Sequence, residues 1–133
     1  MSHSSSPDSK IVLVNNFDHY LKLIEGEKRV IVLDFSAQWC GPCKKLLPVL
    51  DKLAQDFSNQ VLVLTVDADH DQQIEDDDQK MSPHFKIEAL PTLVFLKNCT
   101  FQTGDDFRIE GYGQAQLEKL KTALKTLANI TPR

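Results

Sequence analysis

The amino-acid sequence predicts an α/β fold, and three observations support this prediction. Short runs of β-branched and apolar residues alternate along the chain with segments whose apolar residues recur at helical spacing. Two of these runs, residues 29–35 and 61–66, are almost wholly apolar, which is typical of strands buried on both faces. The chain has 133 residues, of which 41% are hydrophobic, so it can build one packed core. Such alternation implies a central parallel arrangement of strands.

The first half of the chain contains five predicted elements. Residues 11–14 suit a short edge strand, and residues 17–24 place apolar side chains at helical spacing. The buried strand at 29–35 follows, and a long helical pattern then covers residues 42–57. The strand at 61–66 completes the order β-α-β-α-β.

An acidic segment, residues 67–83, interrupts this rhythm. Seven of its first twelve residues are acidic and none is basic. A helix is expected around residues 72–80, with residues 82–83 ending it or starting a new short turn. The D-x-D-x-D pattern that begins at Asp67 suggests calcium, but the glycine and terminal glutamate of an EF-hand loop are missing at their offsets. We therefore expect no calcium site.

The C-terminal part of the chain returns to strand and helix patterns. Residues 92–96 predict a third buried strand, residues 97–105 a turn and residues 107–110 a short strand. A final helix carries one apolar stripe, which we interpret as core packing. The stripe consists of Leu117, Leu120, Leu124 and Leu127.

Composition and charge argue against several function classes. No apolar run approaches the roughly 18 residues of a membrane helix, and the net charge of −4 argues against nucleic-acid binding. Residues 1–8 lack the apolar block of a secretory signal and the arginines of a mitochondrial presequence. We expect them to form a disordered tail before a single domain at residues 9–130. Three cysteines make no disulfide framework for a domain of this size, so a cytoplasmic location is expected.

The paired cysteines of the stretch SAQWCGPCKK, Cys40 and Cys43, allow three interpretations. A zinc site usually needs two such pairs, or one pair with histidines, but Cys99 has no cysteine near it and the four histidines show no ligand spacing. A purely structural disulfide is also a poor fit, because the stabilisation gained by constraining the unfolded chain is smallest for a tiny loop. We therefore favour a redox-active pair and expect no bound metal.

The position of Cys40 suits redox chemistry. It is predicted to end a buried strand and start a helix, where unpaired backbone N–H groups and the helix dipole favour the nucleophilic thiolate. Gly41 allows a tight turn and the approach of a substrate, and Pro42 is tolerated in the first helical turn. Cys43 lies one turn further in, is expected to be more shielded, and could resolve a mixed disulfide formed at Cys40.

Asp34 is the one carboxylate in the predicted strand at residues 29–35. Desolvation in an apolar run is expected to raise its pKa. A carboxyl group with a raised pKa beneath a dithiol can serve as general base for the buried thiol. The alternative is that Asp34 faces water at the strand end.

The motif W-C-G-P-C-K at residues 39–44 resembles the active-site motif of the thioredoxins, and the resemblance covers about residues 11–128 and the order of elements. The stretch DFSAQWCGPCK is similar to that of the eukaryotic cytosolic form. This resemblance implies the thioredoxin fold, with a central mixed β-sheet flanked by helices on both faces. It also implies a protein dithiol–disulfide oxidoreductase that reduces substrate disulfides, in which Asp34 transfers a proton for Cys43.

The resemblance further implies which residues shape the substrate groove. Pro91 matches the cis-proline that faces the dithiol in the family, and the neighbouring Leu90 backbone would pair with an extended substrate. Gly111 matches a glycine that lines the groove, and Trp39 is expected to be a partly exposed lid beside the thiols. The alternatives are a trans proline that starts a strand and a glycine that ends one.

The family resemblance also implies partners and a cellular role. Electrons would come from NADPH through a flavoprotein thioredoxin reductase, so this chain would bind no cofactor itself. Its substrates would be oxidised proteins, its role electron transport in cell redox homeostasis, and its state a monomer. Cys99 stands where relatives commonly have a turn glycine, and we interpret it as an incidental surface thiol. A regulatory or dimer-forming role for Cys99 is the alternative.

Two features depart from the family pattern. Many thioredoxins carry a lysine on the third strand near the aspartate, where this chain has Thr65. Without that cation, the pKa of Asp34 is expected to rise further and the resolving step to slow at neutral pH. The stretch from Asp69 to Pro91, which includes most of the acidic segment, is longer than usual in the family. It is interpreted as a solvated, mobile loop or, alternatively, as an element that selects basic partners.

Two further functions therefore remain open. The chain could be a specialised thioredoxin-like protein that serves one partner, selected by the acidic segment. It could also be a protein-binding module in which redox chemistry is incidental.

Overall fold

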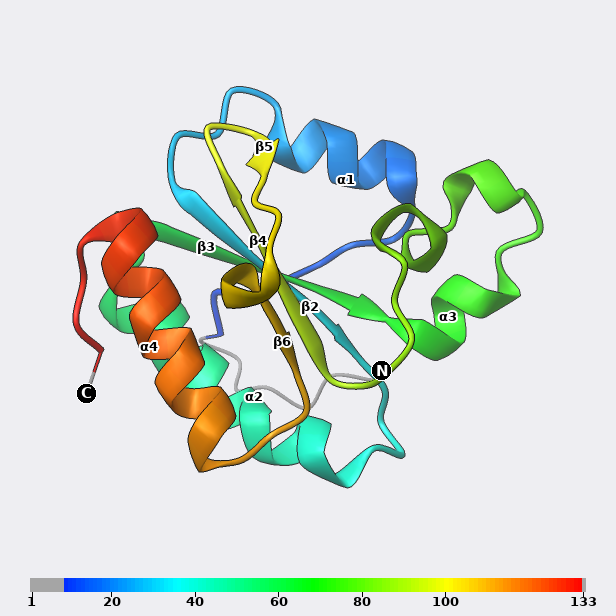
Figure 1. Ribbon diagram of the computed structural model, residues 1–133. Helices are drawn as coiled ribbons and strands as arrows, with labels where there is room; N and C mark the ends of the chain where they lie inside the picture. Colours follow the sequence, from blue (N-terminus) through cyan, green and yellow to red (C-terminus); the bar gives the residue numbers. More distant parts are fainter. Residues whose placement is uncertain (1–8, 133) are drawn as a thin grey trace.

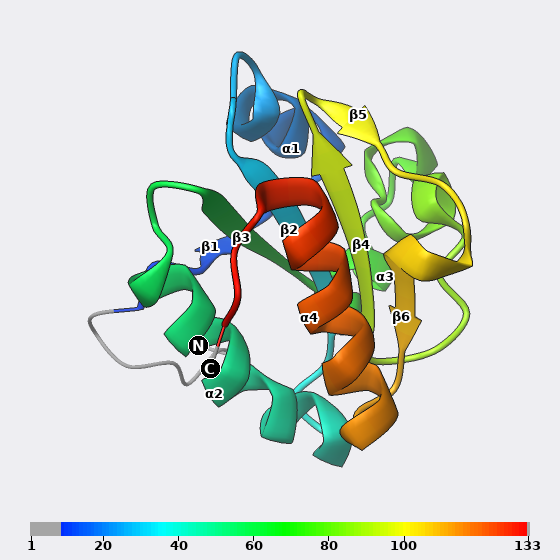
Figure 2. The same ribbon diagram turned by 60° about the vertical axis from the view of Figure 1, so that its left-hand side comes forward.

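The computed structural model describes residues 9–132, which form a mixed β-sheet with helices on both faces (Figure 1). Helices α2 (Gly41–Asp56) and α4 (Gln114–Ala128) cover one face. Helix α1 (Phe17–Ile24) and the short 3₁₀ helix η2 (Ser82–Phe85) cover the other, as the rotated view of Figure 2 shows. The predicted fold class, a central mixed sheet flanked by helices on both faces, is therefore confirmed.

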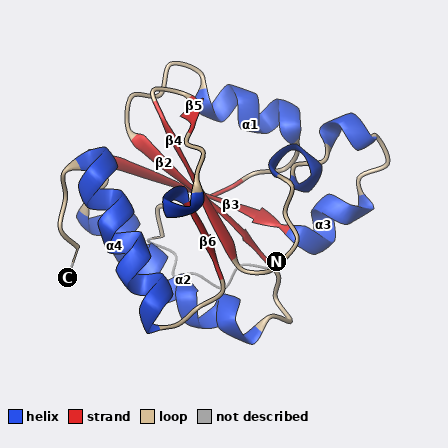
Figure 3. Cartoon of the chain, in the orientation of Figure 1, coloured by secondary structure: helices blue, strands red, loops and turns tan. Residues whose placement is uncertain are grey.

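The described residues contribute six strands, in the order β1-β3-β2-β4-β5, with β6 paired to β4 (Figure 3). The strands are β1 (Val12–Leu13), β2 (Val30–Ser36), β3 (Val61–Asp67), β4 (Thr92–Lys97), β5 (Thr100–Phe101) and β6 (Arg108–Glu110). Strand β3 is parallel to β1 and β2, whereas β4 is antiparallel to β2, β5 and β6. The carboxyl ends of β2 and β3 thus meet at one edge of the sheet, where open α/β sheets commonly bind their ligands.

Local capping sets the limits of the helices. The side chain of Asn16 accepts the His19 N–H at 2.8 Å and so starts α1. Gly26, with φ of +69°, allows the chain to turn after this helix. At the end of α4, Asn129 adopts the left-handed conformation and donates its N–H to the Lys125 carbonyl at 3.0 Å.

Strand β2 divides the core into two clusters. Its residues Val30 and Val32 pack with α2 and α4, whereas Ile31, Leu33 and Phe35 pack with α1 and η2. All seven residues of β2 are buried, which explains why the strand shows no alternation of polar and apolar residues. Full burial of each large apolar side chain contributes about 1.5–3 kcal/mol, so this strand is held rigidly from both sides.

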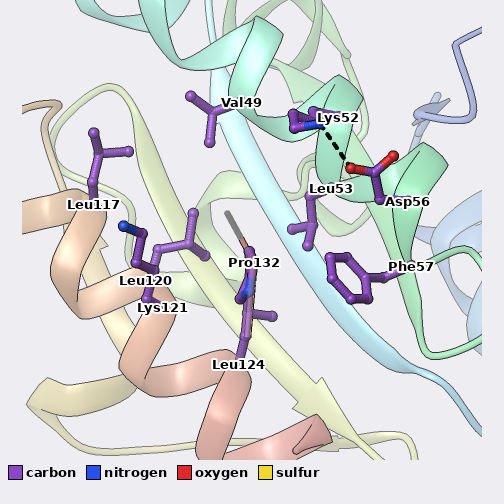
Figure 4. A pocket seen from close by; sticks show the side chains of 10 residues that line it. All are labelled: Val49, Lys52, Leu53, Asp56, Phe57, Leu117, Leu120, Lys121, Leu124 and Pro132. Atoms are coloured by element: carbon purple, nitrogen blue, oxygen red, sulfur yellow. Dashed lines mark ion pairs between the residues drawn. The ribbon is translucent and has the colours of Figure 1, made fainter. Parts of the chain in front are cut away.

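A small apolar pocket lies between α2 and α4 (Figure 4). Leu53 contributes to it from α2 and Leu117 from α4, and Lys52 Nζ pairs with Asp56 Oδ2 at 3.0 Å beside it. None of the site residues predicted from the sequence lines this pocket.

The prediction of a helix around residues 72–80 is wrong. Helix α3 (Ala68–Gln73) starts directly after β3, and a single 3₁₀ turn, η1 (Asp77–Gln79), follows after a break. Asp67 and Asp76 start these two elements, because each accepts the backbone N–H two residues on at 3.0 Å. Such local side-chain bonds compete with a continuous helix, and like charges one turn apart destabilise it further.

The predicted turn at residues 97–105 contains an additional strand, β5. Asn98 and Cys99 form a two-residue hairpin turn between β4 and β5, with φ of 52° and 61°. Cys99 is exposed, as expected, but its thiol donates to the Ile24 carbonyl oxygen at 2.9 Å. This contact joins the hairpin to the end of α1.

Two further expectations concern the chain outside the core. No helix within residues 9–132 is long and apolar enough to cross a bilayer. The tail predicted at residues 1–8 lies outside the described residues.

Candidate active site

The W-C-G-P-C stretch lies where β2 leads into α2, at the edge formed by the carboxyl ends of the parallel strands (Figure 1). Cys40 is the N-cap residue of α2, with extended backbone angles, and Cys43 lies in the first turn. The two cysteines form a disulfide, with Cα atoms 5.3 Å apart. The Cys43 backbone N–H donates to Cys40 Sγ at 3.2 Å. A helix N-terminal donor therefore points at the sulfur of Cys40.

The residues between the cysteines leave open space at Gly41, beside the cysteine pair. A β-carbon at Gly41 would meet no atom within 4 Å, so the chain is open there. Its backbone is outside the left-handed region, so open space rather than turn geometry distinguishes this glycine. Pro42 lies in the first turn of α2, where a missing N–H removes no helical hydrogen bond.

The expected difference in shielding between the two cysteines is absent. Cys40 is 5% exposed and Cys43 is 7% exposed. The two sulfurs are bonded, and each therefore covers part of the other. The distinction between them lies in the N-cap position of Cys40, not in burial.

Asp34 lies inside the sheet, which excludes the water-facing alternative. It is 4% exposed and lies opposite Thr65 in the β2–β3 register, and the Thr65 hydroxyl donates to its Oδ2 at 3.2 Å. No donor in residues 9–132 meets hydrogen-bond geometry at Oδ1. Burial raises the pKa of Asp34 to about 7, while Thr65 and, to a smaller extent, the Ser36 hydroxyl oppose this rise. The expected raised pKa is therefore confirmed.

The loop before β4 lies against the cysteine pair. The Leu90–Pro91 peptide bond is cis, which confirms the conformation expected for Pro91. Leu90 packs against the small cluster that contains both cysteines. Gly111 has φ of +90° and donates its N–H to the Pro91 carbonyl at 2.8 Å, so it is next to the same loop.

Trp39 lies on the outside of the site, as expected for a lid residue. It is 69% exposed, and its indole Nε1–H donates to Asp69 Oδ1 at 3.1 Å. No local pattern in the sequence indicates the contact between Trp39 and Asp69. Asp69 lies 30 residues further along the chain, and the pairing of β2 with β3 brings the start of α3 to the indole.

The remaining predicted features lie apart from this site. Within residues 9–132, no cluster of three or more His, Cys, Asp or Glu side chains could hold a metal ion. Cys99 contacts the end of α1, in the β4–β5 hairpin.

The sequence and the fold of this chain are similar to those of known proteins. The family model for thioredoxin matches residues 9–126. The chain belongs to the thioredoxin family. It is 30% identical to the thioredoxin of Gallus gallus over 113 residues, which cover 85% of this chain and 93% of that one.

Two other relatives extend this comparison. Thioredoxin-T of Drosophila melanogaster is 39% identical over 83 residues, or 62% of this chain, and the match spans only 48% of that longer protein. The crystal structure of thioredoxin NaTrxh from Nicotiana alata superposes with a TM-score of 0.71 at 24% identity, covering 95% of this chain and 99% of that one. At that identity the likeness shows the fold alone.

Family membership and the bonded cysteine pair define the chemistry at a coarse level. This thioredoxin is a thiol–disulfide oxidoreductase. Thioredoxins bind no cofactor themselves, and the family generally acts with thioredoxin reductase and with disulfide substrates.

Proposed function

We propose that this thioredoxin reduces disulfides of other proteins, with Cys40 as the nucleophile and Cys43 as the resolving thiol. The observation that carries the proposal is the position of Cys40 Sγ at the N-cap of α2, bonded to Cys43 and accepting its N–H. In the reduced protein, this donor and the positive end of the helix dipole stabilise a thiolate on Cys40.

The reaction proceeds through two sulfur exchanges. The Cys40 thiolate attacks one sulfur of the substrate disulfide, which breaks that bond and releases the other substrate sulfur as a thiolate. The Cys43 thiolate then attacks Cys40 Sγ in the mixed disulfide and releases the second substrate thiolate. The substrate gains two electrons, and the protein is left with the Cys40–Cys43 disulfide that the structure contains.

Asp34 supplies the proton transfer in the second exchange. Cys43 must lose its proton before it attacks, and a carboxyl group with a pKa of about 7 is poised to take it near neutral pH. A protonated Asp34 cannot act as base, so its raised pKa makes the proton transfer sensitive to pH near neutrality. Thr65 stands where a cation would favour the carboxylate, so we expect the resolving step to slow as the pH falls below about 7.

The substrate segment binds beside the cis-proline loop. Leu90 contacts the cysteine cluster, and Gly111 is hydrogen-bonded to Pro91, so these residues flank the disulfide. We assign the Leu90 backbone to pairing with an extended substrate by strand addition. Trp39 covers the outer side of the site, where its exposed indole offers an apolar contact.

We propose the finer features of the function by analogy with the family. A flavoprotein thioredoxin reductase returns the protein to the dithiol state with electrons from NADPH. We place the protein in the cytoplasm, as a monomer with a single domain over residues 9–130 that serves electron transport in cell redox homeostasis.

Trapping of substrates tests the assignment of the two cysteines. We expect Cys43→Ser to accumulate mixed disulfides with oxidised proteins through Cys40, and Cys40→Ser to form none and to lose turnover. Cys99→Ser is the matched control, because it removes the only other thiol, and it should turn over normally. Binding of partners without turnover, unaffected by Cys40→Ser, would instead support the protein-binding module.

A further inference from the structure

A groove continues from the cysteine pair toward the acidic segment. Trp39 and Leu90 line it, and Leu90 also packs against the cysteine cluster, so one part of the groove adjoins the site of exchange. Gln72 of α3 lines it together with Lys80 and Pro83, which lie at the end of the acidic segment. The groove is therefore continuous with the proposed substrate site, but its wall comes from the part of the chain that departs from the family pattern.

Hydrogen bonds hold the residues that form this wall in place. Asp71 is only 3% exposed, and its carboxylate accepts the Met81 N–H at 2.6 Å and the Ser82 N–H at 3.0 Å. The bond from the Asp18 N–H to Gln79 Oε1, at 3.0 Å, attaches the segment to α1. The acidic segment thus closes on itself through Asp71 and presents a defined surface to the groove.

The charge around the groove is negative. Asp69 is held at the groove by its bond to Trp39, and Glu88 lines the groove directly. Lys80 is the basic side chain among the lining residues, but Asp77 Oδ1 lies 2.9 Å from its Nζ and neutralises it. Asp71, the other acidic lining residue, is buried and bonded to backbone N–H groups. The exposed negative charge at the groove therefore comes from Glu88 and from Asp69 beside Trp39.

We propose that this groove binds an extended, basic stretch of the substrate protein next to its disulfide, and that it thereby selects substrates by charge. The proposal rests on the proposed reduction of protein disulfides. An apolar side chain of the substrate would contact Trp39 and Leu90, while lysine or arginine side chains would lie near Asp69 and Glu88. Charge complementarity of this kind acts mainly on the rate of encounter and on the choice of partner.

The test uses synthetic peptides that share one disulfide and carry one of three flanking segments of eight residues. The flank alternates leucine with lysine, glutamate or glutamine, and it precedes the disulfide in one set of three peptides and follows it in a second set. At about 3.3 Å per residue, an extended flank of eight residues reaches about 26 Å. We expect kcat/KM to be about tenfold higher for the lysine flank than for the glutamate flank at low ionic strength. Salt at about 0.5 M should remove most of this preference.

A pair of neighbouring glutamines provides matched variants. Gln72 lines the groove, whereas Gln73, also exposed and on the same helix, is not among its lining residues. Gln72→Lys should abolish most of the preference for the lysine flank, and Gln72→Glu should increase it. Gln73→Lys changes the net charge equally and should leave the preference nearly intact.

The outcomes separate this proposal from the proposed function. Equal reduction of the three peptides in both sets would overturn charge selection and leave disulfide reduction intact. An equal effect of Gln72→Lys and Gln73→Lys would also overturn the proposal, because the preference would then come from overall charge and not from the groove. Failure to reduce any peptide, together with failure to reduce protein disulfides, would overturn the proposed function itself.

Discussion

Asp34 and Asp71 are the two buried carboxylates in the described residues, and their surroundings are opposite. Their exposed fractions are nearly equal, at 4% and 3%. Asp71 accepts two backbone N–H groups from Met81 and Ser82, whereas Asp34 accepts one hydroxyl and has an oxygen that no donor in residues 9–132 satisfies. Burial alone therefore does not distinguish a structural carboxylate from a reactive one.

The difference arises from the backbone around each side chain. Asp34 lies in the middle of a sheet, where neighbouring backbone N–H groups already bond to adjacent strands. Asp71 faces the start of η2, where the first N–H groups have no intrahelical partner. A carboxylate in the first setting keeps a high proton affinity and can exchange protons, while one in the second serves as a cap.

The largest expected effect is on the resolving step when Asp34 is replaced. Asp34→Asn should slow release of substrate from the mixed disulfide by about a thousandfold, within the usual range for loss of a general base. In the unaltered protein this rate should rise with pH through about 7 and then level off. Stopped-flow measurement of product release checks both expectations, with the exposed Asp105→Asn as control. A release rate in Asp34→Asn equal to that of the unaltered protein would refute the role of Asp34.

Although Asp34→Asn should slow the resolving step, it should raise the free energy of unfolding at alkaline pH. The pKa of Asp34 is about 7 in the folded protein and about 3.9 in an unfolded chain, so the folded state holds its proton longer. The resulting stabilisation is fully present below pH 4 and is lost as the pH rises to about 7. The loss amounts to at most about 4 kcal/mol. Urea denaturation at pH 8 should therefore find Asp34→Asn more stable than the unaltered protein. Equal stability at pH 8 would contradict the high proton affinity of the buried carboxyl.

Replacement of the second carboxylate should destabilise the protein instead. Asp71→Ala leaves the N–H groups of Met81 and Ser82 without their acceptor, which should cost about 2–3 kcal/mol. Urea denaturation measures the loss, and amide hydrogen exchange should accelerate first at Met81 and Ser82. Asp18→Ala, which removes an exposed side chain, is the control. A change in the free energy of unfolding below about 0.5 kcal/mol in Asp71→Ala would show that the acidic segment does not depend on the hydrogen bonds of Asp71.

The smallest expected effect comes from the Thr65 hydroxyl, the stronger of the two hydroxyls that oppose the rise in the pKa of Asp34. Thr65→Val keeps the shape of the side chain but removes the donor to Oδ2, so the pKa of Asp34 should rise above its present value. Resolution at pH 7 should then slow by about two- to threefold, and the midpoint of the pH–rate curve should move upward. Thr65→Ser retains the donor and should keep the original midpoint. A pH–rate curve of Thr65→Val that matches that of the unaltered protein would refute an effect of Thr65 on the pKa of Asp34.

Much of the fold could be predicted from the sequence because its signals are local. The apolar run at β2 and the helical spacing of α2 each depend on neighbouring residues, and both appear as predicted. The acidic segment could not be predicted in the same way. Its composition favours several local caps over one helix, and the choice among them depends on contacts from Asp71 to residues ten positions away.

The sequence by itself determined the chemistry that this protein carries: two cysteines placed at a strand–helix boundary and a carboxyl group within a buried strand. These are properties of residue type and short-range spacing. The tertiary structure decided how the groups are tuned. It placed Thr65 opposite Asp34, Leu90 against the cysteines and Asp69 at the Trp39 indole. Each of these contacts joins segments far apart in the chain, so strand register and helix placement, not local pattern, bring them together.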